Sequence, residues 1–368
     1  MAELDRILDA IHDWSEHGVG FALATVVGVR GSTYRGLGAR QLVAADGAGV
    51  GTVSGGCLDQ ELHRIALEVI ETHRAQIVEF DLTADDEAIW GWGIGCNGAT
   101  RLLVEPAGSA RDLARHILAA RADQRPLAIT HVLDPGPLGL AVGARRYDRL
   151  DGDGADGLGD LDAPVQELAR RALHRGRHEL VTVGGAELFI EVVGAPSRLV
   201  ICGAGHDATP VARYGTELGF EVVVVDDRRQ VLDRERFDRE VALVHGRPAD
   251  LAEHVELDAR TYVVVMSHNY LRDLDYLRCL IGTEVAYIGA LGPGARLERL
   301  LKDLEAEGVE VGETDLAKIH APAGLDVGAE GPQEIAWAIL AEILAVRRGR
   351  GAGFLRRRKG PEVLRRLP

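Results

Sequence analysis

Short apolar runs alternate with amphipathic stretches along the C-terminal half of the chain. The runs lie at residues 199–202, 221–226, 241–244, 261–266 and 284–288. Uninterrupted apolar strands that alternate with helices are typical of a parallel sheet covered on both faces. We therefore predict a Rossmann-like, doubly wound α/β domain over residues 197–349, with a last helix that begins near Pro332.

The N-terminal half has a more mixed pattern. Helical periodicity predicts helices at 3–17, 58–72 and 111–122. Strand-like runs lie at 21–29, 40–45, 50–54, 76–82, 100–105, 127–133, 138–147, 179–183 and 187–193. These elements predict an N-terminal α/β domain at 1–107, continued by an intermediate α/β segment at 108–196, and the remaining residues 350–368 form a basic tail.

A dinucleotide-binding pattern follows the first C-terminal strand. Gly203 allows a tight turn, Gly205 lets the backbone approach a pyrophosphate, and Ala208 takes the helix-packing position. Asp226 ends the next strand, where a carboxylate that binds a ribose is expected. Strand, glycine turn, helix and acid together predict a nucleotide or phosphate site.

Polar loops follow other strands of the same predicted sheet. Ser267 and His268 follow the fourth strand, and residues 289–292 follow the fifth. Ligands of open parallel sheets bind beyond the carboxyl ends of the strands, so these loops are candidates to line the site. His268 is a candidate proton donor or acceptor or, alternatively, a helix cap. His206 is a candidate ligand contact or a cap of the first helix.

The N-terminal half offers a second candidate site, built from two glycine-flanked cysteines. Gly55 and Gly56 precede Cys57 at a predicted strand-to-helix turn, and Cys96 lies in a second glycine-rich stretch. A thiol near a helix N-terminus has a lowered pKa, although acidic residues in the first turn of this helix oppose the effect. Soft thiolates bind molybdenum or copper or carry a persulfide, whereas many free cysteines are only structural. Both interpretations stay open.

Other residues have more ordinary interpretations. Cys202 and Cys279 lie inside apolar runs and are predicted to be structural. Arg30, Arg35 and Arg40 surround a Gly-Ser-Thr turn and would suit a phosphate, or are surface arginines.

Composition restricts the class of protein. The chain has 368 residues, of which 46% are apolar and 27% charged, as in soluble globular proteins. Its apolar runs stay below the roughly 18 residues of a membrane span, and its first residues do not resemble a signal peptide. We therefore expect a cytoplasmic protein with no membrane association. Four cysteines without a C-x-x-C pair exclude a zinc ribbon and argue against an iron–sulfur cluster.

Charge is unevenly distributed. Residues 347–368 carry nine Lys or Arg and one acidic residue, whereas the remainder has 33 basic and 56 acidic residues, for a net charge of −23. An acidic body disfavours nucleic acid as a partner, and the tail is interpreted as a solvated end.

The combination resembles the XdhC/CoxI family of maturation factors for molybdenum hydroxylases. The segments that carry the resemblance are 31–40, 51–57, 95–96, 203–206, 224–228, 264–268 and 319–330. The resemblance implies a chaperone that binds molybdenum cofactor, protects it while its terminal sulfido ligand is installed, and delivers it to an apo molybdenum hydroxylase such as xanthine or CO dehydrogenase. It also implies a cysteine desulfurase as partner, with Cys57 and Cys96 as the molybdenum or sulfur contacts. A homodimer is expected because dimers are the commonest oligomers.

Two other functions compete with the chaperone. An NAD(P)-dependent oxidoreductase would use Asp226 to favour NAD and His268 as acid or base, but it leaves the glycine–cysteine loops unexplained. A molybdenum hydroxylase is a poor alternative, because the chain is short and four separated cysteines cannot hold two iron–sulfur clusters. We therefore expect a cofactor chaperone rather than a catalyst.

Overall fold

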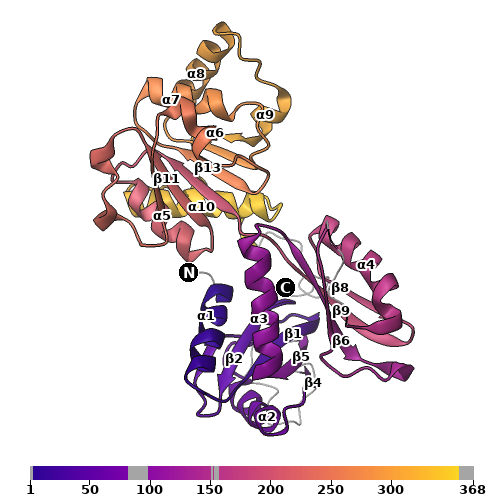
Figure 1. Ribbon diagram of the computed structural model, residues 1–368. Helices are drawn as coiled ribbons and strands as arrows, with labels where there is room; N and C mark the ends of the chain where they lie inside the picture. The colour runs from indigo at the N-terminus through magenta and orange to yellow at the C-terminus, as the bar shows by residue number, and fades with distance from the viewer. Residues whose placement is uncertain (1–2, 82–97, 151, 153–156, 356–368) are drawn as a thin grey trace, which may run out of the picture. The chain divides into compact units, whose positions relative to one another are not determined.

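The computed structural model describes residues 3–81, 98–150, 152 and 157–355 (Figure 1). The chain divides into two compact units. The N-terminal unit runs from Glu3 to Ala195, and the second, which we call the Rossmann unit, begins at Pro196. Within the described ranges, no helix is long and apolar enough to cross a membrane. Most of the predicted basic tail and Cys96 lie outside the described residues.

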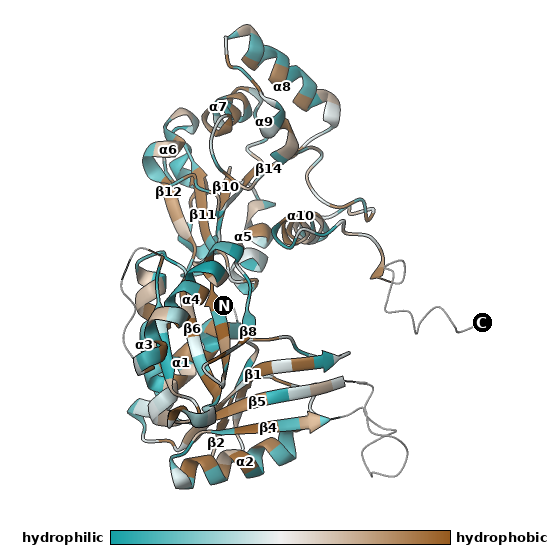
Figure 2. Cartoon of the chain, turned by 90° about the vertical axis from the view of Figure 1, so that its right-hand side faces the viewer, coloured by the Kyte–Doolittle hydropathy of each residue, from teal (hydrophilic) through white to brown (hydrophobic). Residues whose placement is uncertain are grey.

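A five-stranded antiparallel sheet, ordered β3-β2-β1-β5-β4, forms the first half of the N-terminal unit. Its strands are β1 (Phe21–Gly31), β2 (Arg40–Ala44), β3 (Gly49–Gly51), β4 (Gln76–Asp81) and β5 (Gly98–Pro106). Helices α1 (Glu3–Glu16) and α3 (Ala107–Ala122) pack on one face, and α2 (Asp59–Thr72) packs on the other. In Figure 2, α2 carries both brown and teal residues, as expected of a helix with one buried side. Because both faces are covered, the first eight residues of β1 are all buried.

A four-stranded antiparallel sheet, ordered β7-β6-β9-β8, forms the other half of this unit. It contains β6 (Leu127–Asp134), β7 (Arg145–Asp148), β8 (Glu179–Val183) and β9 (Ala186–Val193), and α4 (Asp162–Arg175) packs against it. Short 3₁₀ turns lie at Gly136–Leu138 and Gly159–Leu161. The strand predicted at 138–147 is wrong over most of its length, because Gly139 and Gly143 adopt positive φ angles and break it. Helix α4 was not predicted.

The Rossmann unit is built on a six-stranded parallel sheet ordered β12-β11-β10-β13-β14-β15. The strands are β10 (Arg198–Cys202), β11 (Glu221–Asp226), β12 (Ala242–His245), β13 (Thr261–Val265), β14 (Tyr287–Ala290) and β15 (Ile319–His320). In chain order this is 3-2-1-4-5-6, the arrangement of dinucleotide-binding folds. The predicted doubly wound parallel sheet is confirmed, although β14 begins three residues after the predicted strand and the two-residue β15 was not predicted.

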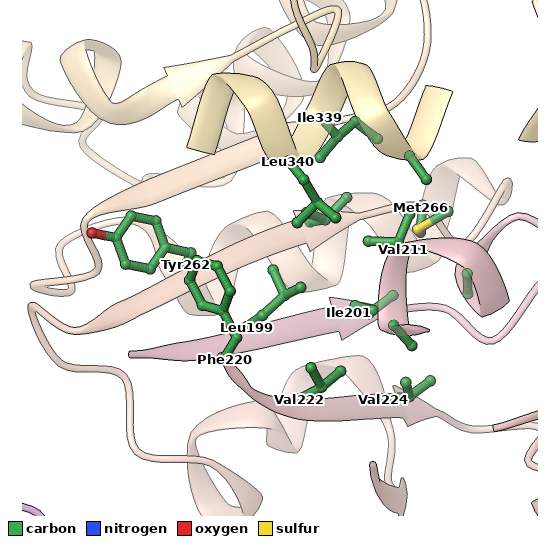
Figure 3. Close-up of a cluster of buried hydrophobic side chains, with 14 of the residues drawn as sticks. Leu199, Ile201, Val211, Phe220, Val222, Val224, Tyr262, Met266, Ile339 and Leu340 are labelled. Atoms are coloured by element: carbon green, nitrogen blue, oxygen red, sulfur yellow. The ribbon is translucent and has the colours of Figure 1, made fainter. Parts of the chain in front are cut away.

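Helices cover both faces of the parallel sheet. Helices α5 (Ala208–Glu217) and α10 (Pro332–Arg347) lie on one face, and α6 (Leu251–His254), α7 (Tyr270–Leu280) and α8 (Gly294–Ala306) on the other. Helix α9 (Glu313–Lys318) leads into β15, and 3₁₀ turns lie at Arg229–Val231, Arg234–Arg236 and Pro248–Asp250. Figure 3 shows Val211 of α5 and Ile339 of α10 packed over Leu199 and Ile201 of β10. This packing fixes the carboxyl ends of the strands, where the loops predicted to bind a ligand begin.

Candidate functional site

The glycine turn after β10 has the backbone that the sequence predicts. Gly203 has a φ of +117°, and a Cβ there would lie 2.7 Å from the carbonyl oxygen of Met266. A side chain is therefore excluded by both conformation and space. Gly205 follows within the same turn, and His206 is exposed.

The carboxylate of Asp226 is bonded within the protein. Asp226 is 1% exposed at the end of β11, and its side chain accepts the Ala204 N–H at 2.8 Å. It also accepts the Arg228 backbone N–H at 2.8 Å and the Arg228 guanidinium at 2.9 and 3.0 Å. Burial raises the pKa of Asp226, but the hydrogen bonds from Arg228 and Ala204 outweigh burial and lower it. The ionised carboxylate therefore ties the glycine turn to β11.

Loops after β10 and β13 meet through His268. The Nε2 atom of His268 lies 2.7 Å from Oδ2 of Asp207, and its side chain is 59% exposed. His268 has a φ of +56°, a conformation that is uncommon for a residue other than glycine. This contact orients the imidazole next to the glycine turn; a proton-transfer role for it stays a prediction.

Ser267 belongs to a buried polar relay. Its Oγ donates to Oδ1 of Asp273 at 2.5 Å, and the other carboxylate oxygen of Asp273 accepts the Nη2 of Arg296 at 2.7 Å. The Arg296 guanidinium also lies 5.4 Å from the ring centre of Tyr270. Asp273, a residue that is 3% exposed, thus holds Arg296 in one orientation.

A groove of about 540 Å³ lies at this carboxyl edge, and we call it the edge groove. It is lined by Met266, His268, Asp273, Leu291, Gly292, Pro293, Arg296, Pro322, Ala323 and Ile335. Its volume falls within the range of small-molecule sites, roughly 300–1,000 Å³. A mainly apolar wall with a few convergent polar groups is the usual composition of such a site.

The second candidate site begins at the turn between β3 and α2. Gly56 has a φ of +99°, and its N–H donates to Oγ of Ser54 at 3.1 Å. A Cβ on Gly55 would lie 3.6 Å from the ring of Tyr34, so the loop after β1 approaches this turn. Cys57 is partly exposed just before the helix. This turn therefore places the partly exposed Cys57 near a helix N-terminus.

The other predicted thiol of that site, Cys96, lies outside the described residues. Within the described ranges, no three His, Cys, Asp or Glu side chains gather as metal ligands would. The roles of Cys57 and Cys96 stay predictions. Cys202 is buried in the core and Cys279 packs against it, which confirms their structural interpretation.

The three arginines that are candidate phosphate ligands all pair with carboxylates. Arg30 pairs with Asp81 at 2.7 Å, Arg35 pairs with Glu3, and the buried Arg40 pairs with Glu191 at 2.6 Å. Their paired state favours a structural role.

Arg40 belongs to a buried charged cluster between the two sheets of the N-terminal unit. Glu191 also lies 3.2 Å from Nε2 of His131, and Arg145 Nε donates to His131 Nδ1 at 3.2 Å. Arg145 in turn pairs with Glu105. Burial lowers the pKa of His131 to about 4. Burial raises the pKa of Glu191, but Arg40 and His131 outweigh burial and bring it to about 2. The imidazole is therefore neutral, with its proton on Nε2.

Family models match both units. The model described as the XdhC and CoxI family matches residues 14–81, and the XdhC Rossmann domain matches residues 199–343. The chain belongs to the XdhC/CoxI family. The first match includes the Cys57 turn, and the second includes the glycine turn and the whole lining of the edge groove.

Relatives of this XdhC/CoxI chain match along most of its length. A probable xanthine dehydrogenase subunit from Bacillus subtilis is 29% identical over 95% of this chain and 98% of its own. The molybdenum cofactor insertion chaperone PaoD from Escherichia coli is 28% identical over 90% of this chain and 84% of its own. A crystal structure of a xanthine dehydrogenase from Bacillus halodurans has a TM-score of 0.77 at 26% identity, covering 98% of both chains.

Three side chains of the candidate site in the Rossmann unit were not predicted as site residues. Arg228 belongs to segment 224–228, which carries the family resemblance, but no contact was assigned to it. Neither Asp273 nor Arg296 was predicted. The available signal was position: Arg296 lies four residues after Gly292, in the loop and helix that follow a predicted strand. Arginine at such a place is a common anion ligand.

Proposed function

We propose that this chain is a maturation factor that binds molybdenum cofactor, assists its sulfuration, and inserts it into an apo molybdenum hydroxylase. The cofactor is then the cargo, and a cysteine desulfurase supplies the sulfur. The observation that carries the proposal is the edge groove with its oriented arginine, in a chain similar along most of its length to a molybdenum cofactor insertion chaperone.

Each unit contributes different chemistry to this proposal. The edge groove offers an apolar wall for a flat ring and Arg296 for a phosphate. Cys57, partly exposed at its glycine turn, supplies a soft thiolate for the metal or for a sulfur atom in transit, together with Cys96. A homodimer would present two copies of each site.

A dehydrogenase is the alternative function, and it rests on the strand order of the sheet and on the His268–Asp207 contact. The bonded state of Asp226 argues against it, because a ribose would have to displace Arg228 from the carboxylate. The single experiment that separates the two is equilibrium binding of the full chain to molybdenum cofactor, with NAD and NADP titrated in parallel.

The expected result is tight binding of the molybdenum cofactor that falls on Cys57→Ala, with the folded fraction unchanged. Cys279→Ala is the matched control, since its thiol contacts the backbone carbonyls of Pro248 and Ala249 and is not part of either site. Nicotinamide binding without binding of the molybdenum cofactor would refute the chaperone and leave the dehydrogenase.

A further inference from the structure

We infer that the edge groove selects a flat heterocycle bearing one phosphate, held by Arg296, and that it excludes dinucleotides. This inference deepens the proposed function and rests on it, because it names the class of ligand that the Rossmann unit takes. Its test does not require molybdenum cofactor.

The position that a ribose would take is closed. In a dinucleotide-binding fold the acid after the second strand accepts the ribose hydroxyls. Here both oxygens of Asp226 are bonded to Arg228, and one also accepts the Ala204 N–H. Arg236 further donates to the carbonyl oxygens of Ala204 at 3.0 Å and Gly205 at 2.6 Å. The side of the glycine turn that faces β11 is therefore filled by the protein's own groups.

Arg296 is held in one orientation. Its Nη2 is held by Asp273, and the ring of Tyr270 lies under its guanidinium. A guanidinium has five N–H donors in a planar fork, so the bond to Asp273 leaves donors for an anion in the groove. The carboxylate of Asp273 is occupied on both oxygens, by Ser267 and by Arg296 itself. Both oxygens of the carboxylate that orients Arg296 are therefore engaged within the protein, although Asp273 itself lines the groove.

The wall of the edge groove is mainly apolar. Met266, Leu291, Pro322 and Ile335 line the groove from the ends of β13, β14 and β15 and from α10. These side chains offer apolar surface but few hydrogen bonds, which suits the face of a flat ring. A flat ring against this wall and a phosphate at Arg296 would together fill the groove. A second nucleotide has no place, because the side of the glycine turn that faces β11 is closed.

Flavin mononucleotide and riboflavin form a suitable pair of probes, because they share one flat ring system and differ by a phosphate. We would titrate each into the full chain and follow flavin fluorescence, with NAD measured by calorimetry. We expect flavin mononucleotide to bind at least ten times more tightly than riboflavin, and NAD to bind more weakly than both.

Arg296→Gln should abolish the preference for the phosphate while riboflavin binding stays within twofold. Arg299→Gln is the matched control: this arginine also lies 5.4 Å from the ring centre of Tyr270, but it does not line the groove. Arg296→Lys keeps the charge and should retain part of the preference, which separates loss of the anion contact from loss of the fold.

Several outcomes would overturn the inference: equal binding of the two flavins, equal effects of Arg296→Gln and Arg299→Gln, NAD binding as tight as flavin mononucleotide, or no flavin binding at all. The proposed function is tested separately. If molybdenum cofactor binds equally well to the Arg296→Gln variant and to the parent, the inference fails and the chaperone stands. If the flavins behave as expected and molybdenum cofactor does not bind, the chaperone fails and the inference stands.

Discussion

The neutral, buried His131 makes the N-terminal unit sensitive to mild acid. Burial lowers its pKa to about 4, whereas the unfolded chain has the ordinary value of about 6.5. Between these two values the unfolded state binds a proton that the folded state does not. The free energy of unfolding therefore falls as the pH is lowered through this window.

The expected size follows from the two pKa values. Proton linkage gives a loss of about 2 kcal/mol between pH 7 and pH 5 for this one residue. Glu191 acts at lower pH. Because its pKa is lowered to about 2, it stabilises the fold at pH values above the ordinary pKa of a glutamate, and this stability is lost as the pH falls toward about 2. Measurement at pH 5 therefore separates the histidine from the carboxylate.

The assay is urea-induced unfolding, monitored through hydrogen exchange. Exchange is measured in peptides from β6 and β9, because these strands report on the N-terminal unit alone. Wild type should lose about 2 kcal/mol more than His131→Gln between pH 7 and pH 5. His178→Gln measures a second contribution of the same sign, because burial also lowers the pKa of His178. His12→Gln is the exposed control. Equal pH dependence in wild type and His131→Gln would refute the reasoning.

Three further predictions concern stability and reactivity. Gly203→Val should destabilise the Rossmann unit by about 2 kcal/mol or more, because it adds both backbone strain and a clash; thermal unfolding checks this against Gly194→Ala, where the added Cβ meets open space. Arg40→Met should cost roughly 3–5 kcal/mol by leaving Glu191 buried without its guanidinium, and the Arg40→Met/Glu191→Leu double variant should recover much of that loss in a denaturant titration. Cys202 should stay unreactive toward a thiol reagent until the protein unfolds, since burial raises its pKa; labelling of the native protein at this position would contradict the structure.

The parallel sheet could be predicted because its strands are buried on both faces. Val222 to Val225 in β11 form an almost continuous apolar run, and helices at regular intervals leave few alternative topologies. Helix α4 was missed because two of its four buried residues are alanines, so its apolar stripe is weak. The two residues of β15 are too short to carry any periodicity.

The sequence predicted which loops form the candidate site, but not the hydrogen bonds between their side chains. Asp226 ends β11, and Gly203, Ser267 and His268 follow β10 and β13. A parallel sheet brings these strand ends to one edge, so the sequence could place the four residues together; that they bind a ligand stays a prediction. The sequence did not show that Asp226 is hydrogen-bonded to Arg228, which leaves its carboxylate unavailable to a ribose. Which donors meet a carboxylate depends on side-chain geometry, and strand order alone does not fix that geometry.

The pair Arg40–Glu191 has a consequence for the order in which the chain folds. The two residues are 151 positions apart in the sequence, and the paired residues of β1 and β5 are about half as far apart in the sequence. Contacts between such distant residues close large loops, which slows folding. During synthesis the N-terminal unit cannot complete its charged cluster until β9 has left the ribosome. The Rossmann unit follows as one contiguous segment and can collapse by itself. The order of synthesis therefore places the long loop closures of the N-terminal unit before the Rossmann unit emerges.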